Sequence, residues 1–352
     1  MPGLRPRVIR TTSRIATAAG DVWPGLLTAA TIGTAAVFVS SRYGGPALVF
    51  ALLLGMAFNF LSENARTKTG IEFTAKRVLR LGVALLGARI GIEQMLELGW
   101  AAVATILAMV PLTILVGRLI ARKLGQSAQM GVLTGGAVAI CGASAALAIS
   151  SVLPPSKDRE RDTLFTVVGV TTLSTVCMIV YPIVLSPFGL SDLQAGYVIG
   201  ASVHDVAQVV GAGYVISEPA GDAATLTKLI RVAMLIPTTL VLAQVFAVRD
   251  ASADTARGGL KRIRVPTFLV GFIALAAAAN LGWLPAFAVQ AAEAGSRWCL
   301  IVAIAALGVK TVLKDLLDLG WRPLALMLAE TVFMVLVPMS LVLAGGILLI
   351  SG

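Results

Sequence analysis

Residues 131–145 read GVLTGGAVAICGASA, and residues 200–213 read GASVHDVAQVVGAG. Both stretches are dense in Gly, Ala and Ser and poor in Leu and Phe. Such a composition is typical of helices that are interrupted inside a protein and present free backbone groups to a cavity. The segments that contain these stretches, 129–153 and 194–216, therefore decide the architecture that we expect for the whole chain.

The rest of the chain is typical of an all-α, polytopic membrane protein. Of its 352 residues, 57% are hydrophobic and 13% are charged, which is about half the charged fraction of a soluble protein. Apolar runs long enough to cross roughly 30 Å of hydrocarbon alternate with polar breakers, and predict about 9–11 transmembrane segments. Besides the two glycine-rich segments, the predicted spans are 23–41, 44–62, 71–91, 99–118, 163–186, 224–248, 265–282, 292–312 and 323–350.

The net charge of +10 is explained by the loops rather than by a nucleic-acid partner. If both glycine-rich segments enter the membrane and return, 23 of the 28 Lys and Arg fall in loops on one side, and the opposite loops hold one. Cytoplasmic loops are enriched in Lys and Arg, so this distribution favours re-entrant hairpins and a cytoplasmic N-terminus. Full crossings would place the basic loop 154–162 outside, and this alternative stays open.

A stretch of the first half recurs in the second half. LGARIGIEQMLELGW at 86–100 aligns without a gap on LGVKTVLKDLLDLGW at 307–321, a shift of 221 residues that also places Asn59 on Asn280. The number of spans between the copies reverses their direction. We therefore predict an inverted-topology repeat, which is typical of secondary transporters; chance similarity between leucine-rich stretches is the alternative.

A histidine and a carboxylate stand in the middle of the second glycine-rich stretch. His204 is the only histidine in the chain, Asp205 follows it, and Gln208 lies one helical turn further on. Ionisable groups inside a membrane are costly unless they are paired or hydrated, and histidine, with an ordinary pKa of about 6.5, exchanges protons near neutral pH. We expect His204 and Asp205 to carry a coupling proton, and His204 and Gln208 to contact substrate. A His–Asp pair that only caps a broken helix is the alternative.

Two basic residues, Lys228 and Arg231, lie in the next span. They are three residues apart and share a helix face, and Arg231 lies roughly 10 Å inside the span at ~1.5 Å per residue. A buried guanidinium can bind an anion bidentately or balance Asp205, whereas Lys228 could extend to the interface instead. We expect both residues to bind an anionic substrate.

The first glycine-rich stretch offers thiol, hydroxyl and backbone N–H groups at Cys141, Gly142, Ala143 and Ser144. A helix that begins there would point its positive end at an anion without any charged side chain. We count these residues as substrate-binding candidates; close helix packing by small residues is the alternative. Arg89 and Lys310 lie at span ends and are interpreted as structural. Glu330 lies inside a span and is a candidate for the coupling site.

These motifs resemble those of a known family. AICGASA at 139–145, SVHDVAQVVGAG at 202–213 and TKLIRV at 227–232 occur in the order and spacing of the YeiH family, over almost the whole chain. The resemblance implies a multi-pass protein of the bacterial inner membrane that exports sulfate or a related sulfur oxyanion. That family is similar in architecture to transporters of the bile-acid and arsenite type, whose broken helices cross, and this likeness implies full crossings instead of hairpins.

The sequence predicts a single integral membrane transporter domain over 1–352. Its expected parts are a cytoplasmic N-terminal arm at 1–22, a first repeat at 23–128, the glycine-rich core segments at 129–216 and a second repeat at 217–352. The predicted function is secondary transport of a small anion, such as sulfate, sulfite or a small sulfonate, by alternating access with proton coupling. The expected partners are this anion and the lipid bilayer, and the sequence leaves room for a homo-oligomer.

Two other functions stay open. Ser144 and His204 could form the dyad of an intramembrane serine hydrolase, or the scaffold could conduct anions as a channel. However, the residue after Ser144 is Ala145, and the sequence has no HExxH motif and no cluster of metal ligands. We therefore expect no enzymatic activity, no metal and no cofactor.

Overall fold

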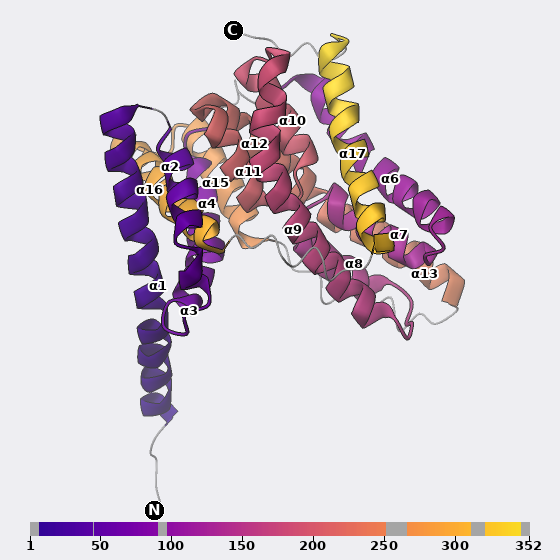
Figure 1. Ribbon diagram of the computed structural model, residues 1–352, viewed down its shortest axis with the longest axis horizontal. Coiled ribbons are helices and arrows are strands. Elements are labelled where there is room, and N and C mark those ends of the chain that lie inside the picture. Colours follow the sequence, from indigo (N-terminus) through magenta and orange to yellow (C-terminus); the bar gives the residue numbers. More distant parts are fainter. Residues whose placement is uncertain (1–6, 45, 91–96, 251–265, 311–320, 346–352) are drawn as a thin grey trace, which may run out of the picture. The chain divides into compact units, whose positions relative to one another are not determined.

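The computed structural model describes residues 7–44, 46–90, 97–250, 266–310 and 321–345, and every regular element in these ranges is a helix (Figure 1). The predicted all-α fold is confirmed. Contacts group the residues into two compact units, Met1–Val83 with Glu293–Thr311 and Ala84–Ala292 with Val312–Gly352.

The first unit contains the N-terminal helices. They are α1 (Arg7–Tyr43), α2 (Ala47–Ala57), α3 (Lys68–Phe73), the start of α4 (Leu79–Leu86) and most of α16 (Ala286–Lys310). Helix α1 begins at Arg7, so much of the predicted arm 1–22 is helical and continuous with the first span. Gly25 of α1 packs backbone to backbone against Gly70 of α3.

The second unit contains both glycine-rich segments and the helices around them. Its helices are α6 (Gly99–Lys123), α7 (Ala128–Ala139), α8 (Ala143–Val152), α9 (Arg159–Leu185), α10 (Asp192–Ser202), α11 (Val206–Ile216), α12 (Glu218–Ala233), α13 (Leu235–Asp250), α15 (Thr267–Asn280) and α17 (Trp321–Leu343). Helices α6, α7 and α17 pack together, and α12 packs along both α10 and α11 (Figure 1).

The first glycine-rich segment is a re-entrant hairpin, here named hairpin 1 (128–152). Helix α7 ends at Ala139, and Gly142 then adopts φ 65° and ψ −128°, a conformation that only glycine adopts readily. Its N–H donates to the carbonyl oxygen of Ala137 at 2.8 Å, which closes the turn. Helix α8 runs back along α7, because the side chain of Ile149 packs against Gly136.

The second glycine-rich segment is also a re-entrant hairpin, here named hairpin 2 (192–216). Gly196, near the start of α10, contacts Ala220 and Ala223 of α12. Gly213, near the end of α11, contacts Ala220 and Ala224 of the same helix. Because both ends of the segment lie beside one turn of α12, the chain enters and returns on the same side.

The two hairpins enter from opposite ends of α9. Hairpin 1 ends just before α9 begins, and hairpin 2 starts just after α9 ends. Both segments fold back on themselves, as the prediction of re-entrant hairpins requires, and their side of the membrane stays a prediction.

Each hairpin is packed closely against one long neighbour. Gly131 of α7 lies against Gly117 of α6, with no room for a Cβ atom on either residue. On hairpin 2, Gly200 lies against the carbonyl oxygen of Ala224 and the side chain of Thr227, both on α12. Small residues thus hold hairpin 1 to α6 and hairpin 2 to α12 through direct backbone approach.

Helices suited to crossing a bilayer occur where the hydropathy predicts them. In the described residues, six are long and apolar enough: Gly20–Tyr43, Gly99–Lys123, Arg159–Phe188, Glu218–Phe246, Ala286–Lys310 and Trp321–Leu343. The predicted spans 44–62, 71–91 and 265–282 contain shorter helices, because α2 ends at Ala57, a π-helical turn separates α3 from α4, and α15 covers 14 residues. In the last predicted span, 323–350, α17 ends at Leu343, and residues 346–350 lie outside the described residues.

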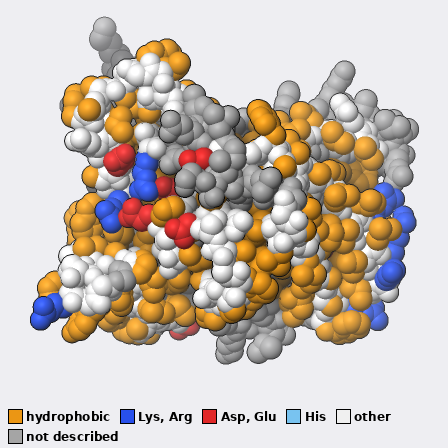
Figure 2. Space-filling model, turned by 90° about the horizontal axis from the view of Figure 1, so that it is seen from above, with side chains coloured by type: hydrophobic (Ala, Val, Ile, Leu, Met, Phe, Trp, Pro, Cys, Tyr) orange, Lys and Arg blue, Asp and Glu red, His pale blue; other side chains and the backbone are white. Residues whose placement is uncertain are grey.

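Large hydrophobic side chains cover the outside of the protein. Phe38, Trp100 and Phe287 expose 70%, 81% and 75% of their surface. Figure 2 shows hydrophobic side chains over most of the face in view, with acidic and basic side chains gathered in a few places. An exposed apolar surface of this extent is unsuited to water and suits the hydrocarbon of a bilayer. The predicted multi-pass membrane protein is confirmed.

Two asparagines related by the 221-residue shift make corresponding contacts. In the first unit, Asn59 donates from Nδ2 to the carbonyl oxygen of Val309 at 2.7 Å. In the second unit, its counterpart Asn280 donates from Nδ2 to the carbonyl oxygen of Ile90 at 3.1 Å. Each asparagine thus binds the chain near the end of the other copy's helix.

Two glycines related by the same shift also make corresponding contacts. Gly308 packs against the carbonyl oxygen of Leu52 on α2 in the first unit. Gly87 packs against the carbonyl oxygen of Phe272 on α15 in the second unit. Leu52 and Phe272 are 220 residues apart, which differs by one residue from the repeat shift of 221.

One pair of positions 221 residues apart is in direct contact. The hydroxyl oxygen of Thr113 on α6 lies 2.9 Å from the sulfur of Met334 on α17. The aligned strings that first suggested the repeat lie partly outside the described residues, at 91–96 and 311–320. In the described residues, the contacts above follow the same shift of 221 residues.

Candidate functional site

The tips of the two hairpins meet beside the middle of α9. A Cβ atom on Gly142, at the tip of hairpin 1, would lie 3.7 Å from the carbonyl oxygen of His204 and 3.8 Å from Cβ of Asp205. The backbone N–H of Asp205 donates to Ser174 Oγ of α9 at 3.0 Å, and its carboxylate accepts from the N–H of Ala207 at 3.3 Å as the N-cap of α11. The structure thus brings the two predicted motifs together.

Lys228 joins the two tips. Its side chain is fully buried, so it does not extend to the interface. Its ammonium group donates to the carbonyl oxygen of Ile140 in hairpin 1 at 2.6 Å and to that of Val203 in hairpin 2 at 2.9 Å. Both carbonyls follow the last turn of a helix, where the backbone lacks its usual partners. Lys228 therefore links the two helix ends.

Arg231 makes a second link through all three of its nitrogens. Nε donates to Ala139 O at 2.7 Å and Nη2 to Val138 O at 2.7 Å, both in hairpin 1. Nη1 donates to Gly200 O at 2.8 Å and to Val203 O at 3.0 Å in hairpin 2. The predicted bidentate partner was an anion, whereas in this conformation the guanidinium binds backbone carbonyls.

The charges around the tips leave a positive balance. The C-terminal ends of α7 and α10 each carry about half a negative charge, and the N-terminal ends of α8 and α11 each carry about half a positive charge, so the four helix ends roughly cancel. Two buried cations, Lys228 and Arg231, then face one nearby carboxylate, Asp205, which is partly exposed. Among the described residues, the basic side chains at the tips therefore outnumber the carboxylates.

His204 is held by α17. Its ring is fully buried, and Nε2 lies 2.9 Å from the hydroxyl oxygen of Thr331. That hydroxyl donates its single proton to the carbonyl oxygen of Met327 at 2.7 Å, so it accepts from the ring, and Nε2 carries hydrogen. Among the described residues, Nδ1 has no hydrogen-bond partner. Nδ1 of His204 is therefore a buried ring nitrogen beside the hairpin tips.

The other predicted residues differ in accessibility. Gln208 donates from Nε2 to Thr175 Oγ1 at 3.3 Å, and its Oε1 has no partner in the described part of the chain. Cys141 is buried, Ala143 is partly exposed and Ser144 is exposed. The structure describes no hydrogen bond between Ser144 and His204, because the ring is directed to α17 by its Nε2. The accessible part of the tips is thus the uncapped first turn of α8 together with Asp205.

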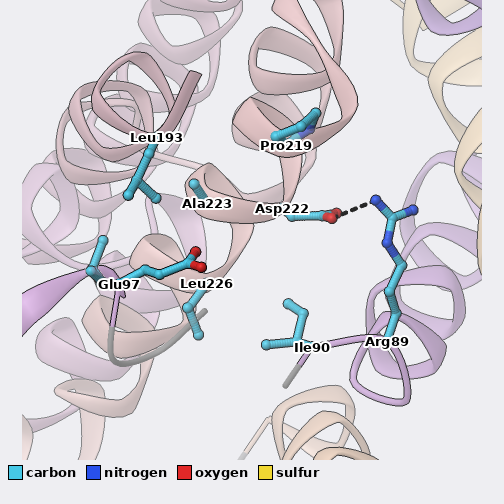
Figure 3. Close-up of a pocket in the computed structure, with 9 residues that line it drawn as sticks. Arg89, Ile90, Glu97, Leu193, Pro219, Asp222, Ala223 and Leu226 are labelled. Atoms are coloured by element: carbon cyan, nitrogen blue, oxygen red, sulfur yellow. Dashed lines mark hydrogen bonds and ion pairs between the residues drawn. The ribbon is translucent and has the colours of Figure 1, made fainter. Parts of the chain in front are cut away.

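A separate pocket lies at the opposite end of α12 from Arg231 and was not anticipated from the sequence. It has a volume of about 200 Å³ and is lined by Arg89, Ile90, Glu97, Leu98, Leu193, Pro219, Asp222, Ala223 and Leu226. Figure 3 shows Arg89 pointing across it to Asp222, with an Nη2–Oδ2 distance of 2.6 Å. Asp222 also accepts from the Tyr214 hydroxyl. Arg89, interpreted from the sequence as a span-end residue, is therefore an ion-pair partner.

A simple signal could have indicated this pocket. Glu218 and Asp222 are acidic residues four apart at the start of a span, and carboxylates in that position need a cation. Arg89 supplies it, since Nη1 also lies 3.6 Å from Glu218 Oε2. In the described part of the chain, no group of three or more His, Cys, Asp or Glu is arranged to hold a metal ion.

Comparisons with known proteins give the family. Residues 24–327 match the family described as conserved hypothetical protein 698. The chain is 48% identical over 313 residues to the UPF0324 membrane protein CT0845 of Chlorobaculum tepidum, covering 89% of this chain and 87% of the relative. It is 49% identical over 313 residues to the UPF0324 membrane protein TauZ of Paracoccus denitrificans, covering 89% and 92%.

A more distant relative, a UPF0324 membrane protein of Caulobacter vibrioides, is 36% identical over 330 residues, with 93% of this chain and 69% of the relative covered. No solved structure matches the chain. The family resemblance inferred from the two glycine-rich motifs is confirmed. The chain belongs to the conserved hypothetical protein 698 family of membrane proteins.

Proposed function

We propose that this protein is a secondary transporter of a small anion, which binds where the tips of hairpins 1 and 2 meet. The observation that carries the proposal is the pair of buried cations, Lys228 and Arg231, which hold carbonyls of both hairpins at once. Two hairpins that enter from opposite ends of α9 and touch at their tips can each screen the site from one side of the membrane. Alternating access requires this arrangement.

The charge balance supports an anion rather than a cation. Lys228 and Arg231 outnumber Asp205 at the tips, and a low-dielectric interior strengthens their attraction for an anion. The first turn of α8 adds backbone N–H groups, since no side chain caps it at Gly142. A helix N-terminus without a cap is a ready anion-binding group, and the exposed Ser144 hydroxyl lies in the same turn.

On this proposal the predicted residues divide into three roles. The N–H groups around Gly142 and Ser144 bind the anion directly. Lys228 and Arg231 supply the positive potential and keep the tips in register. His204 and Asp205 exchange the coupling proton, since Nδ1 of His204 is an acceptor without a partner in the described residues. The chain then performs no covalent chemistry, and Ser144 acts as a hydrogen-bond donor.

The repeat supports the same proposal. Asn59 and Asn280 make corresponding contacts in the two units, and Thr113 touches its own counterpart Met334. An odd number of crossings separates the two copies, so a repeat of this kind has inverted topology. Inverted repeats are a common basis of alternating access, with the substrate site near the membrane midplane.

The resemblance of the motifs to the YeiH family points to sulfur oxyanions as the substrate class. We place the protein in the bacterial inner membrane with a cytoplasmic N-terminus, because that orientation puts the basic loops in the cytoplasm. The probes that follow are sulfate, sulfite and a two-carbon sulfonate, with chloride and acetate as comparison anions.

Purified protein in liposomes tests the function. We expect saturable uptake of at least one labelled sulfur oxyanion, accelerated by an imposed pH gradient. Arg231→Met should abolish uptake, whereas Arg231→Lys, which keeps the charge, should retain part of it. Arg161→Met is the matched control, since it removes a charge that is 60% exposed near the start of α9. Uptake by Arg231→Met at the wild-type rate would show that the cation pair is not part of the binding site. A flux that does not saturate with anion concentration would identify a channel.

A further inference from the structure

Glu330 is a fully buried acidic residue outside the hairpin tips. It lies on α17, and its carboxyl group faces α6 and α7. The absence of a side chain on Gly117 makes room for it, because a Cβ atom there would collide with Glu330 Oε1. Oε1 lies 2.8 Å from Thr134 Oγ1 of α7, while Oε2 has no partner in the described residues.

Among the residues that the structure describes, no cation balances this carboxyl group. The charged or titratable side chains on the elements packed around it are Arg118, Arg122 and Lys123 on α6, Arg159, Glu160, Arg161, Asp162, Cys177 and Tyr181 on α9, Asp192 and Tyr197 on α10, Arg322 on α17 itself, and His204 beyond Thr331; α7 has none. Among the described residues, no Lys, Arg or His nitrogen lies within ion-pair distance of Glu330. An ionised carboxylate in such a place is strongly disfavoured, and a group so placed takes up a proton instead.

The hydrogen bonds around Thr134 fit a protonated carboxyl group. The Thr134 hydroxyl lies 3.0 Å from the carbonyl oxygen of Met130 as well as 2.8 Å from Glu330 Oε1, and it has one proton to give. Threonines elsewhere in these helices, such as Thr113 and Thr331, lie within hydrogen-bond distance of the carbonyl four residues back. If Thr134 gives its proton to Met130, Glu330 must be the donor in the other bond, and the carboxyl group is neutral.

We propose that Glu330 is a proton-binding site, which holds its proton in this conformation and donates it to Thr134 of hairpin 1. When hairpin 1 moves away from α17, the O–H bond breaks, the proton passes to water, and the carboxylate remains. Its neighbour Thr331 binds His204 of hairpin 2, so successive residues of α17 contact the two hairpins. The use of this proton in coupling rests on the proposed transport function; the protonation itself does not.

Infrared spectroscopy of the whole protein tests the protonation directly. We expect wild-type protein at neutral pH to show the carbonyl-stretch band of a protonated carboxylic acid, and Glu330→Gln to lose it. The isosteric amide can still donate to Thr134, so this variant should fold. Asp222→Asn is the matched control, because Asp222 is a buried carboxylate that has a cation, Arg89, and the band should remain.

A second variant tests whether the carboxylic-acid band depends on the contact between Glu330 and Thr134. Thr134→Val removes the acceptor, so the band should shift in frequency and stay present. A band of equal intensity in wild type and Glu330→Gln would overturn the proposal, as would its loss in Asp222→Asn alone.

Transport by the same variants tests the coupling role separately. We expect Glu330→Gln to exchange labelled anion for unlabelled anion at a rate within about threefold of wild type, and to lose anion accumulation driven by a pH gradient. Retained pH-driven accumulation would overturn the coupling role. If wild type transports none of the probe anions while the infrared result holds, the transport proposal fails and the proton-binding site stands.

Discussion

Lys228 and Arg231 share one acceptor, the carbonyl oxygen of Val203, at 2.9 and 3.0 Å. Loss of one side chain would therefore leave a different number of backbone carbonyls without a donor than loss of the other. Removal of Lys228 takes away the donor to the Ile140 carbonyl, whereas the Val203 carbonyl still accepts from Arg231. Removal of Arg231 withdraws the donors of Ala139, Val138 and Gly200.

This difference predicts an order of stability. A buried acceptor left without its donor costs about 1–3 kcal/mol, so Arg231→Met should lower the free energy of unfolding more than Lys228→Met does. Thermal unfolding in detergent measures the order, with Arg161→Met as the exposed control. Equal melting temperatures for the two buried variants would contradict these hydrogen bonds.

The tip of hairpin 1 depends on a glycine conformation. Gly142 has φ 65° and ψ −128°, so Gly142→Ala should cost about 1–3 kcal/mol through backbone strain alone, since the space around its Cβ position is adequate. Gly189, with φ 61° and ψ 31°, lies in the left-handed region that asparagine tolerates, and Gly189→Asn should be near neutral. Melting temperatures compare the two, and similar losses would refute the special role of the tip.

The hairpin topology predicts which positions share a side of the membrane. In a protein whose native cysteines at 141, 177 and 299 are replaced, single cysteines at Gln126 and Lys157 should react with an impermeant maleimide from the same side. A cysteine at Ser191 should react only from the other side. Reaction of the Gln126 and Lys157 variants from opposite sides would show that the first glycine-rich segment crosses the membrane completely.

The pocket between Arg89 and Asp222 predicts an energetic coupling. Directly paired residues typically couple by about 0.5–3 kcal/mol, and the Arg89 side chain is 33% exposed, so we expect the lower half of this range. A double-mutant cycle with Arg89→Met and Asp222→Asn measures it. Additive effects of the two substitutions would show that the ion pair adds nothing to stability.

The sequence was sufficient for much of this fold because the bilayer constrains the chain so strongly. Hydropathy located the helices, and the distribution of Lys and Arg favoured hairpins over crossings. The two motifs around Cys141 and His204 were predicted to share one site, and the structure brings them together at the hairpin tips.

The partners of the buried charges could not be read from the sequence. Arg231 binds backbone carbonyls 92 and 93 residues away, and backbone groups carry no signature in a side-chain pattern. Glu330 and Thr134 are separated by 196 residues, and Arg89 and Asp222 by 133. Helical periodicity specifies which face a residue occupies, whereas tertiary packing specifies what that face meets.

The glycine contacts of the hairpins restrict how the core can come apart. Hairpin 1 is fixed to α6 through Gly117 and Gly131, and hairpin 2 to α12 through Gly200, so neither tip can swing without its helix. The bonds from Lys228 and Arg231 on α12 to hairpin 1 join these two parts. Separation of the two parts would break side-chain bonds and leave the backbone hydrogen bonds of the helices intact, so the proposed alternating access would require no unfolding.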